Sequence, residues 1–210
     1  LLGETHKCIL VTSTLPNEGK SFISLNLALS FASAQNRTLL IGFDLRKGNH
    51  LLNELVSIDA IKGLTSYLIN QASLEEIIIK TEDQNLDFIP CGPIPPDPVA
   101  LLSLQRNKIL FEELKSVYDY IILDTPPYGL VTDAFLLMKH ADIKLYVSRL
   151  RVIAKNTLRQ SIEDIISKRI ENIYILANDC KEIDKAYNKN YTTKRLHKKK
   201  SIKFFLNIKN

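Results

Sequence analysis

Residues 9–22 read ILVTSTLPNEGKSF and are the strongest indication of the fold in this sequence. It starts with an apolar run that ends in small polar residues, and a turn then breaks the chain. The turn consists of Pro16, Asn17, Glu18 and Gly19. Lys20 and Ser21 then open a long apolar segment, so the order is strand, loop and helix. Such a loop points backbone N–H groups inward, where the positive end of the helix dipole also lies. The stretch therefore predicts a site for the phosphates of a nucleotide.

Two side chains of this stretch fit nucleotide chemistry. Lys20 can reach the terminal phosphates, and the Ser21 hydroxyl can hold a magnesium ion. The general pattern asks for a glycine five residues before Gly19, where this chain has Thr14, so the Walker A pattern is only partly met. The alternative is an ordinary strand–turn–helix with a chance Gly-Lys-Ser. The flanking apolar segments on both sides favour the phosphate loop.

Apolar runs alternate with helical patterns along the rest of the chain. Further strands are expected at 38–43, 86–90, 120–124, 143–148 and 172–177. Helices are expected at about 21–34, 51–56, 64–68, 74–79, 99–104, 109–117, 132–140 and 155–168. Between them, residues 91–98 (CGPIPPDP) contain four prolines and predict a fixed, extended loop. The alternation predicts an α/β fold like that of the P-loop NTPases, with a mostly parallel sheet and helices on both faces.

Polar residues follow several of the expected strands. Ligands of such sheets bind at the carboxyl ends of the strands. Asp124 follows a run of large apolar residues, as a Walker B aspartate does, and is a candidate for the magnesium water shell; a helix-capping or turn aspartate is the alternative. Asp44 follows another strand and gives a weaker signal on its own, which Arg46 beside it strengthens.

Length and composition fit one sizeable α/β domain. The chain has 210 residues, of which 45% are hydrophobic and 24% charged, and no apolar run is long enough for a transmembrane helix or resembles a signal peptide. The three cysteines are far apart and fit neither a disulfide framework nor a zinc site, which favours a reducing cytoplasm. Because the first residue is Leu1, a longer, N-terminally truncated protein is expected.

The charge is unevenly distributed. Residues 185–210 carry a charge of +9, which leaves −4 for the remainder of a chain whose net charge is +5. We therefore expect a nucleotide-binding domain at 1–184 and a basic, disordered tail at 185–210. The tail can be a solvated end, or it can bind an anionic membrane or a nucleic acid.

Four segments in one order carry a resemblance to a known family. They are TSTLPNEGKS (12–21), LLIGFDLRKG (39–48), CGPIPPDPVALL (91–102) and YDYIILDTPPYGLVTDA (118–134). Together they resemble the bacterial tyrosine kinases (BY-kinases) that govern capsule and exopolysaccharide synthesis, over about residues 5–180. The proline loop argues against the partitioning and cell-division ATPases that share the fold.

The resemblance implies ATP and Mg²⁺ as cofactors and a set of roles. The ATP-binding residues would be Pro16, Asn17, Glu18, Gly19, Lys20, Ser21, Phe22 and, against the adenine, Asn178. Catalysis would rest on Lys20, Asp44 and Arg46. The metal would be served by Ser21, Asp44 and Asp124. Tyr187 and Tyr191 would accept phosphate, the tail of one subunit entering the site of a neighbour.

The resemblance also implies partners and a location. It implies a ring-like oligomer and a transmembrane activator, in the same or another chain, at the cytoplasmic face of the plasma membrane. Contact of the basic tail with the anionic membrane is a further hypothesis: Lys194, Arg195 and 198–200 would attract acidic lipid, and Phe204, Phe205, Leu206 and Ile208 would insert at the interface. Nucleic acid is not an expected partner.

Three departures keep two alternatives open. The family motif is Asp-x-Asp-x-Arg, and here Gly42 takes the place of the first aspartate. The tail has two tyrosines instead of a dense cluster, and the helix that forms the family's rings would lie before Leu1. One alternative is therefore a catalytically degenerate, nucleotide-dependent interaction module. The other is a partitioning-type ATPase that binds DNA through the tail, with salt-dependent affinity.

Overall fold

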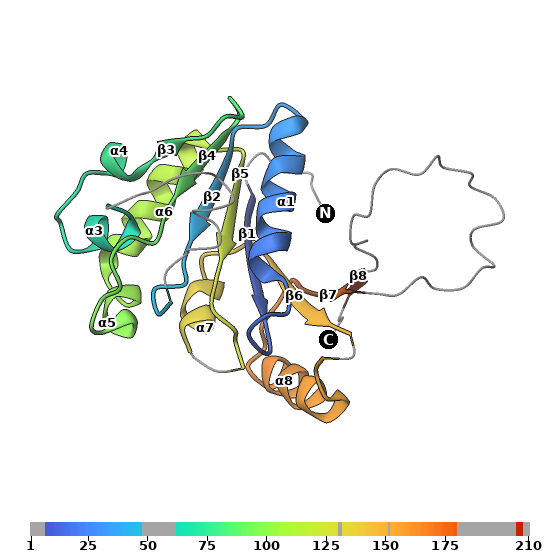
Figure 1. Ribbon diagram of the computed structural model, residues 1–210. Coiled ribbons are helices and arrows are strands. Elements are labelled where there is room, and N and C mark those ends of the chain that lie inside the picture. The colour runs from blue at the N-terminus through green and yellow to red at the C-terminus, as the bar shows by residue number, and fades with distance from the viewer. Residues whose placement is uncertain (1–6, 48–61, 130–131, 151, 180–204, 208–210) are drawn as a thin grey trace, which may run out of the picture.

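The computed structural model describes residues 7–47, 62–129, 132–150, 152–179 and 205–207. These residues form an eight-stranded sheet in the order β3-β4-β2-β5-β1-β6-β7-β8 (Figure 1). The strands are β1 (Lys7–Ser13), β2 (Thr38–Gly42), β3 (Ile79–Lys80), β4 (Leu86–Ile89), β5 (Tyr120–Asp124), β6 (Ile143–Arg149), β7 (Ile173–Asn178) and β8 (Phe205–Asn207). The six central strands are parallel, and β3 and β8 pair antiparallel at the two edges.

Seven helices of the described residues join and cover the strands. They are α1 (Lys20–Ser33), α3 (Leu64–Leu68), α4 (Leu74–Ile77), α5 (Pro98–Leu102), α6 (Gln105–Val117), α7 (Asp133–Met138) and α8 (Lys155–Ser167). The predicted α/β fold with a mostly parallel sheet is confirmed.

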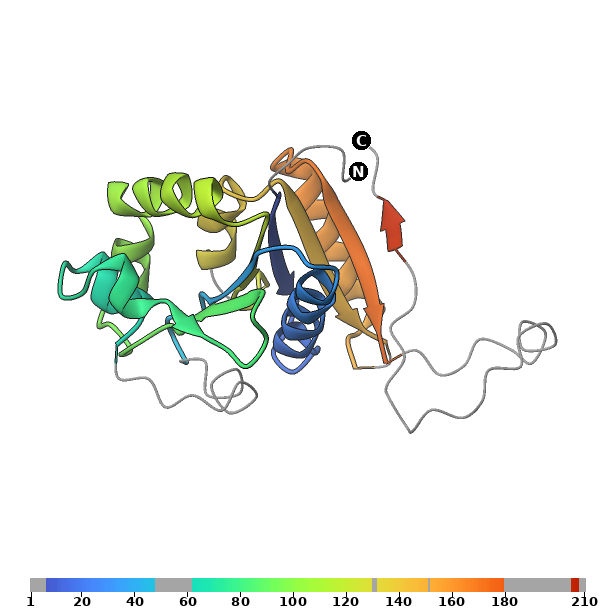
Figure 2. The same cartoon turned by 90° about the horizontal axis from the view of Figure 1, so that it is seen from above.

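Two apolar layers hold the helices on opposite faces of the sheet. On one face, Ile23, Ala28 and Ala32 of α1 pack against strand residues such as Val11 and Ile122. On the other face, helices α6, α7 and α8 pack against a larger layer. Figure 2 shows α1 on the side of the sheet opposite to α6 and α8. The central strands are apolar on both sides because helices exclude water from both faces.

The strand register brings the predicted site segments to one edge. Asp124 at the end of β5 is in register with Gly42 at the end of β2 and with Val11 of β1. Because these strands are parallel, the loops after β1, β2 and β5 leave the sheet side by side. Segments separated by about eighty residues of chain therefore share one small region.

The edges of the sheet differ from the sequence predictions. A helix was expected at 74–79, but α4 ends at Ile77, and Ile79 and Lys80 pair with Phe88 and Asp87. The run Ile77–Ile79 explains this, because consecutive β-branched residues favour extended backbone, and Lys80 also forms an ion pair with Asp87 at 2.7 Å.

The other edge strand, β8, lies within the tail that was expected to be disordered. Its backbone pairs with Tyr174, Ile175 and Leu176 of β7. Phe205 and Leu206, which were predicted to contact a membrane interface, are residues of this strand. The helix expected at 51–56 lies outside the described residues.

Candidate active site

The loop between β1 and α1 has the backbone geometry that a phosphate site requires. Gly19 adopts a left-handed conformation, with φ 97° and ψ 18°. A Cβ at this position would lie 2.2 Å from Nδ2 of Asn178, so any other residue would strain the backbone and displace the Asn178 amide. Gly19 is the N-cap of α1 and provides no side-chain hydrogen bond to the first turn. The first N–H groups of α1 are therefore available to an anion.

Glu18 holds the loop from inside the protein. Its carboxylate is buried and accepts hydrogen bonds from the backbone N–H of Leu15 at 2.7 Å and of Arg149 at 3.0 Å. The Asn178 amide donates to the Glu18 carbonyl at 2.7 Å. Both residues were predicted to bind ATP. Their side chains are occupied in shaping the loop, so Glu18 can meet a phosphate only through its backbone.

The segment after β5 packs against the same loop. The Thr12 hydroxyl donates to the Pro126 carbonyl at 2.9 Å, and the Tyr128 N–H donates to the Ser13 carbonyl at 2.8 Å. A Cβ on Gly129 would lie 2.5 Å from the Thr14 carbonyl oxygen. The two loops are therefore in direct backbone contact, and a shift of one must displace the other.

Ser21 and Asp124 meet at the mouth of the loop. The Ser21 hydroxyl donates to one carboxylate oxygen of Asp124 at 2.7 Å, and Ser24 donates to the other at 3.2 Å. A serine and an aspartate in this arrangement are the protein ligands that a nucleotide-bound Mg²⁺ requires, directly or through water. The described residues contain no cluster of three or more acidic, His or Cys side chains that could hold a metal without a nucleotide.

Lys20 is buried beside these residues. Its ammonium forms no hydrogen bond or ion pair within the part of the chain that the structure describes, and burial lowers its pKa. Asp124, Asp44 and Glu18 oppose that decrease through their negative charges. A buried cation without a direct partner is suited to an anionic ligand, which here means the phosphates of a nucleotide.

Burial of Asp124 has a consequence for stability. Burial raises its pKa to about 6 from 3.8, although Ser21, Ser24 and Lys20 counteract the shift. The folded protein therefore binds this proton more tightly than the unfolded chain, so the free energy of unfolding falls as the pH rises from about 4 to about 6. We expect Asp124→Asn, without nucleotide, to be more stable than the parent by up to about 3 kcal/mol near pH 7, and the difference to vanish near pH 4.

Urea unfolding at both pH values measures this difference. Asp97→Asn is the matched control, since Asp97 caps α5 through a bond to the Ala100 N–H at 3.0 Å and asparagine caps equally well. A difference for Asp124→Asn that does not depend on pH would contradict the expectation.

Asp44 and Arg46 separate in the structure. Asp44 is half-buried at the end of β2, and its Oδ1 accepts from the N–H groups of Arg46 at 3.2 Å and Lys47 at 3.3 Å. The Arg46 guanidinium instead donates two hydrogen bonds to the carboxylate of Asp133 at the start of α7, from Nε to Oδ2 at 2.7 Å and from Nη2 to Oδ1 at 2.8 Å. Asp133 is fully buried. Sequence reasoning missed Asp133, although it lies in the segment TDA that helped to define the family resemblance.

The Arg46–Asp133 pair predicts an asymmetry between its two partners. Arg46→Ala leaves a buried carboxylate without a cation, whereas Asp133→Asn leaves an arginine whose side chain is 37% exposed and can be hydrated. We expect a loss of about 3 kcal/mol in the free energy of unfolding for Arg46→Ala and about 1 kcal/mol for Asp133→Asn. Urea unfolding of both variants and of the double variant tests this, because Asp133→Asn should rescue Arg46→Ala. Equal losses without rescue would contradict the pairing.

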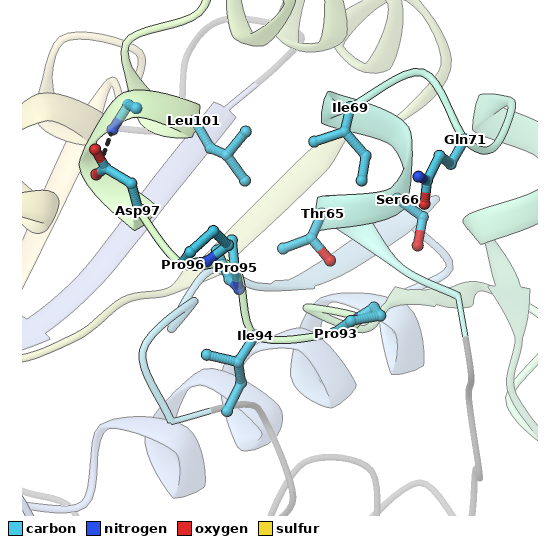
Figure 3. A pocket seen from close by; sticks show the side chains of 11 residues that line it. Thr65, Ser66, Ile69, Gln71, Pro93, Ile94, Pro95, Pro96, Asp97 and Leu101 are labelled. Atoms are coloured by element: carbon cyan, nitrogen blue, oxygen red, sulfur yellow. Dashed lines mark hydrogen bonds between the residues drawn. The ribbon is translucent and has the colours of Figure 1, made fainter.

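The proline loop lines a pocket at the same edge of the sheet. The pocket has a volume of about 360 Å³ and lies between α3, α5 and the loop after β4. Figure 3 shows Pro95 and Pro96 on one side of the pocket and Thr65 and Ile69 on the other, with Ile94 on the same loop as the prolines. Residues between β4 and α5 form neither helix nor strand.

The side chains of three predicted residues, Pro16, Asn17 and Phe22, make no hydrogen bond or ion pair within the part of the chain that the structure describes. Phe22 follows Ser21 in α1 and is 38% exposed. Pro16 is half-buried and Asn17 exposed at the tip of the loop. Tyr187 and Tyr191 lie outside the described residues. None of the described helices has the length and apolar character that a membrane span requires.

The fold and the phosphate loop define a nucleotide-binding protein of the P-loop class. The family model described as "AAA domain" matches residues 7–175. The tyrosine-protein kinase CpsD of Streptococcus agalactiae is 36% identical over 180 residues, which are 86% of this chain and 77% of CpsD. The kinase domain of the Escherichia coli tyrosine kinase ETK is similar in structure, with a TM-score of 0.77 and 28% identity over 90% of this chain and 74% of that one. The chain belongs to the bacterial tyrosine-protein kinase family.

The cell-division ATPases share only the fold. MinD of Pyrococcus horikoshii, solved with Mg-ADP, has a TM-score of 0.68 at 22% identity over 83% of this chain and 70% of its own. The predicted resemblance to the tyrosine kinases is thus confirmed.

Proposed function

We propose that this chain is an ATP- and Mg²⁺-dependent protein-tyrosine kinase that phosphorylates its own tail and regulates capsular or exopolysaccharide synthesis and export. The bond between Ser21 and Asp124 carries the proposal, because it joins the start of α1 to the end of β5 at the mouth of the phosphate loop. Family membership supports the choice of tyrosine as acceptor.

The residues of the site have distinct tasks in such a reaction. Bound MgATP would supply the phosphoryl group and the charge of the metal. The N–H groups after Gly19 and the Lys20 ammonium would hold the phosphates, and Ser21 and Asp124 would position the metal. The tyrosine oxygen forms a bond to the γ-phosphorus while the bond to the bridging oxygen breaks and ADP leaves. Asp44, which is half-buried at the end of β2, receives the phenolic proton.

The position of Arg46 changes its proposed role. Its guanidinium is committed to Asp133, so Arg46 positions the segment that carries Asp44 instead of contacting phosphate. It is a positioning residue in this proposal, whereas the sequence had predicted a catalytic one.

The proposed partners follow the family resemblance. They are further copies of the chain in a ring and a transmembrane activator at the inner face of the plasma membrane. The charge of +9 in residues 185–210 supports additional contact of the tail with anionic lipid. Phosphorylation at Tyr187 and Tyr191 would offset up to about four of these charges and loosen that contact.

Mass spectrometry of the protein incubated with MgATP and an activator fragment tests the proposal. We expect phosphate on Tyr187 and Tyr191, and none in Lys20→Ala. The double variant Tyr187→Phe/Tyr191→Phe should lose the label and keep its affinity for nucleotide. Nucleotide binding without any transfer to tyrosine would favour the second candidate, a degenerate interaction module, which the glycine at position 42 supports.

A further inference from the structure

A second pocket lies at the edge of the sheet opposite to the phosphate loop. It has a volume of about 410 Å³ and is formed by α7, the start of β6 and the turn between α8 and β7. Phe135, Leu136, Met138 and Ile170 form its apolar wall. A volume of this size suits a small organic ligand. None of the residues proposed for nucleotide chemistry lines this pocket.

One buried cation lines the pocket. Lys144 is only 9% exposed, and it alternates along β6 with apolar residues, so it shares the α7 and α8 face of the sheet with Tyr146. Its ammonium forms no hydrogen bond or ion pair within the described residues, and burial lowers its pKa. Burying an unpaired ammonium costs free energy that an apolar residue at this position would not cost.

The other charges around Lys144 leave the pocket positive. Lys139 and Arg169 also line it, against the single acid Glu171. Asp142 is near Lys144 but is engaged elsewhere, since it accepts from the Cys8 N–H at 2.7 Å and lies 3.6 Å from Lys115. Three cations and one acid around an apolar wall favour a ligand that combines a negative head with an apolar body.

We propose that this pocket binds an amphiphilic anion, with its phosphate or carboxylate head at Lys144 and Arg169 and its apolar body against Phe135, Met138 and Ile170. Phe135 is 40% exposed, and the Lys168 ammonium lies over its ring, 5.2 Å from the ring centre. The ring is thus held in place as one wall. Soluble phosphate monoesters and the head groups of acidic phospholipids share this chemistry.

A single NMR signal can report on the pocket. Met138 is the only methionine of the 210 residues and lines the pocket, so methyl-labelled methionine gives one resonance from it. We expect titration with octyl phosphate to shift this resonance in a saturable way. Lys144→Leu should weaken the affinity about 10- to 100-fold, as expected for loss of one charge-assisted contact.

Matched variants separate the pocket from other sites. Lys108→Leu removes an exposed lysine on α6 and should leave the titration unchanged. Lys20→Ala should also bind octyl phosphate with the affinity of the parent. Loss of nucleotide binding can therefore be distinguished from loss of ligand binding in the second pocket. If Lys144→Leu does not fold, Arg169→Gln provides the same test from the exposed side of the pocket.

Two further ligands define the outcome. Uncharged 1-octanol should bind at least tenfold more weakly than octyl phosphate, because it has no charge for Lys144. If vesicles that contain phosphatidylglycerol perturb the Met138 signal and vesicles of phosphatidylcholine do not, the natural ligand is an acidic phospholipid. If only octyl phosphate perturbs the signal, the natural ligand is a soluble phosphate ester. Equal affinities for octanol and octyl phosphate would overturn the proposal, and so would an unchanged affinity for octyl phosphate in both pocket variants. Lys144 would then be a lysine whose ammonium is hydrated and binds no ligand.

Discussion

Replacing Lys20 by alanine should weaken the binding of MgATP by well over tenfold and abolish measurable transfer to tyrosine. The ammonium is buried, has no direct partner within the described residues and is near three carboxylates, those of Asp124, Asp44 and Glu18. Without it, the phosphates would meet a negative site. The loss of charge-assisted bonds and the unopposed repulsion both reduce affinity.

Calorimetry with MgADP and with a non-hydrolysable ATP analogue measures the effect. Lys47→Ala is the matched control, because Lys47 is exposed at the same edge of the sheet and should bind nucleotide within about twofold of the parent. Equal affinities of Lys20→Ala and the parent would disprove the assignment of residues 14–21 as a phosphate loop.

Gly42→Asp should raise tyrosine phosphorylation by about a hundredfold or more, because the restored first aspartate of the family motif would be a better-placed proton acceptor than Asp44. Gly42 ends β2 in register with Asp124, so a carboxylate introduced there would stand beside the proposed metal site. The parent, with Asp44 and Asp124 alone, is expected to be a weak kinase. Because Asp124 already has a raised pKa, the second carboxylate should also make activity depend more strongly on Mg²⁺.

Transfer of radiolabel from ATP compares the two proteins, with an activator fragment present. Gly42→Asn is the control: it has the shape of aspartate without the charge, so any gain from improved packing would appear in both variants. A parent that is strongly active and does not gain from Gly42→Asp would mean that Asp44 and Asp124 suffice.

The central strands could be predicted from sequence because they are continuous apolar runs bounded by polar ends. The two edge strands could not be predicted in this way. The short strand β3 depends on pairing with Phe88 and Asp87, and β8 pairs with a strand about thirty residues before it. Neither has a periodicity of its own, so local patterns carry no signal for them.

The candidate site shows the same division. Lys20, Ser21 and Asp124 were predicted from their places at the ends of strands and at the start of a helix. The partner of Arg46 was not, because Asp133 is 87 residues away in the sequence and only the fold brings its carboxylate to the guanidinium. Likewise, the pattern around Glu18 does not reveal that its carboxylate turns inward to accept from the N–H of Arg149.

That long-range bond affects when the chain becomes competent during synthesis. The whole phosphate-loop sequence has left the ribosome once residue 21 emerges. The Glu18 carboxylate, however, can accept its hydrogen bond from the Arg149 N–H only after residue 149 has been synthesised, and the Glu18 carbonyl can accept from the Asn178 amide only after residue 178. A nascent chain that does not yet include Asn178 thus has the motif but lacks at least one of the two contacts that fix the loop. ATP should then stabilise completed molecules and not growing ones, so the ligand cannot trap a partly synthesised domain.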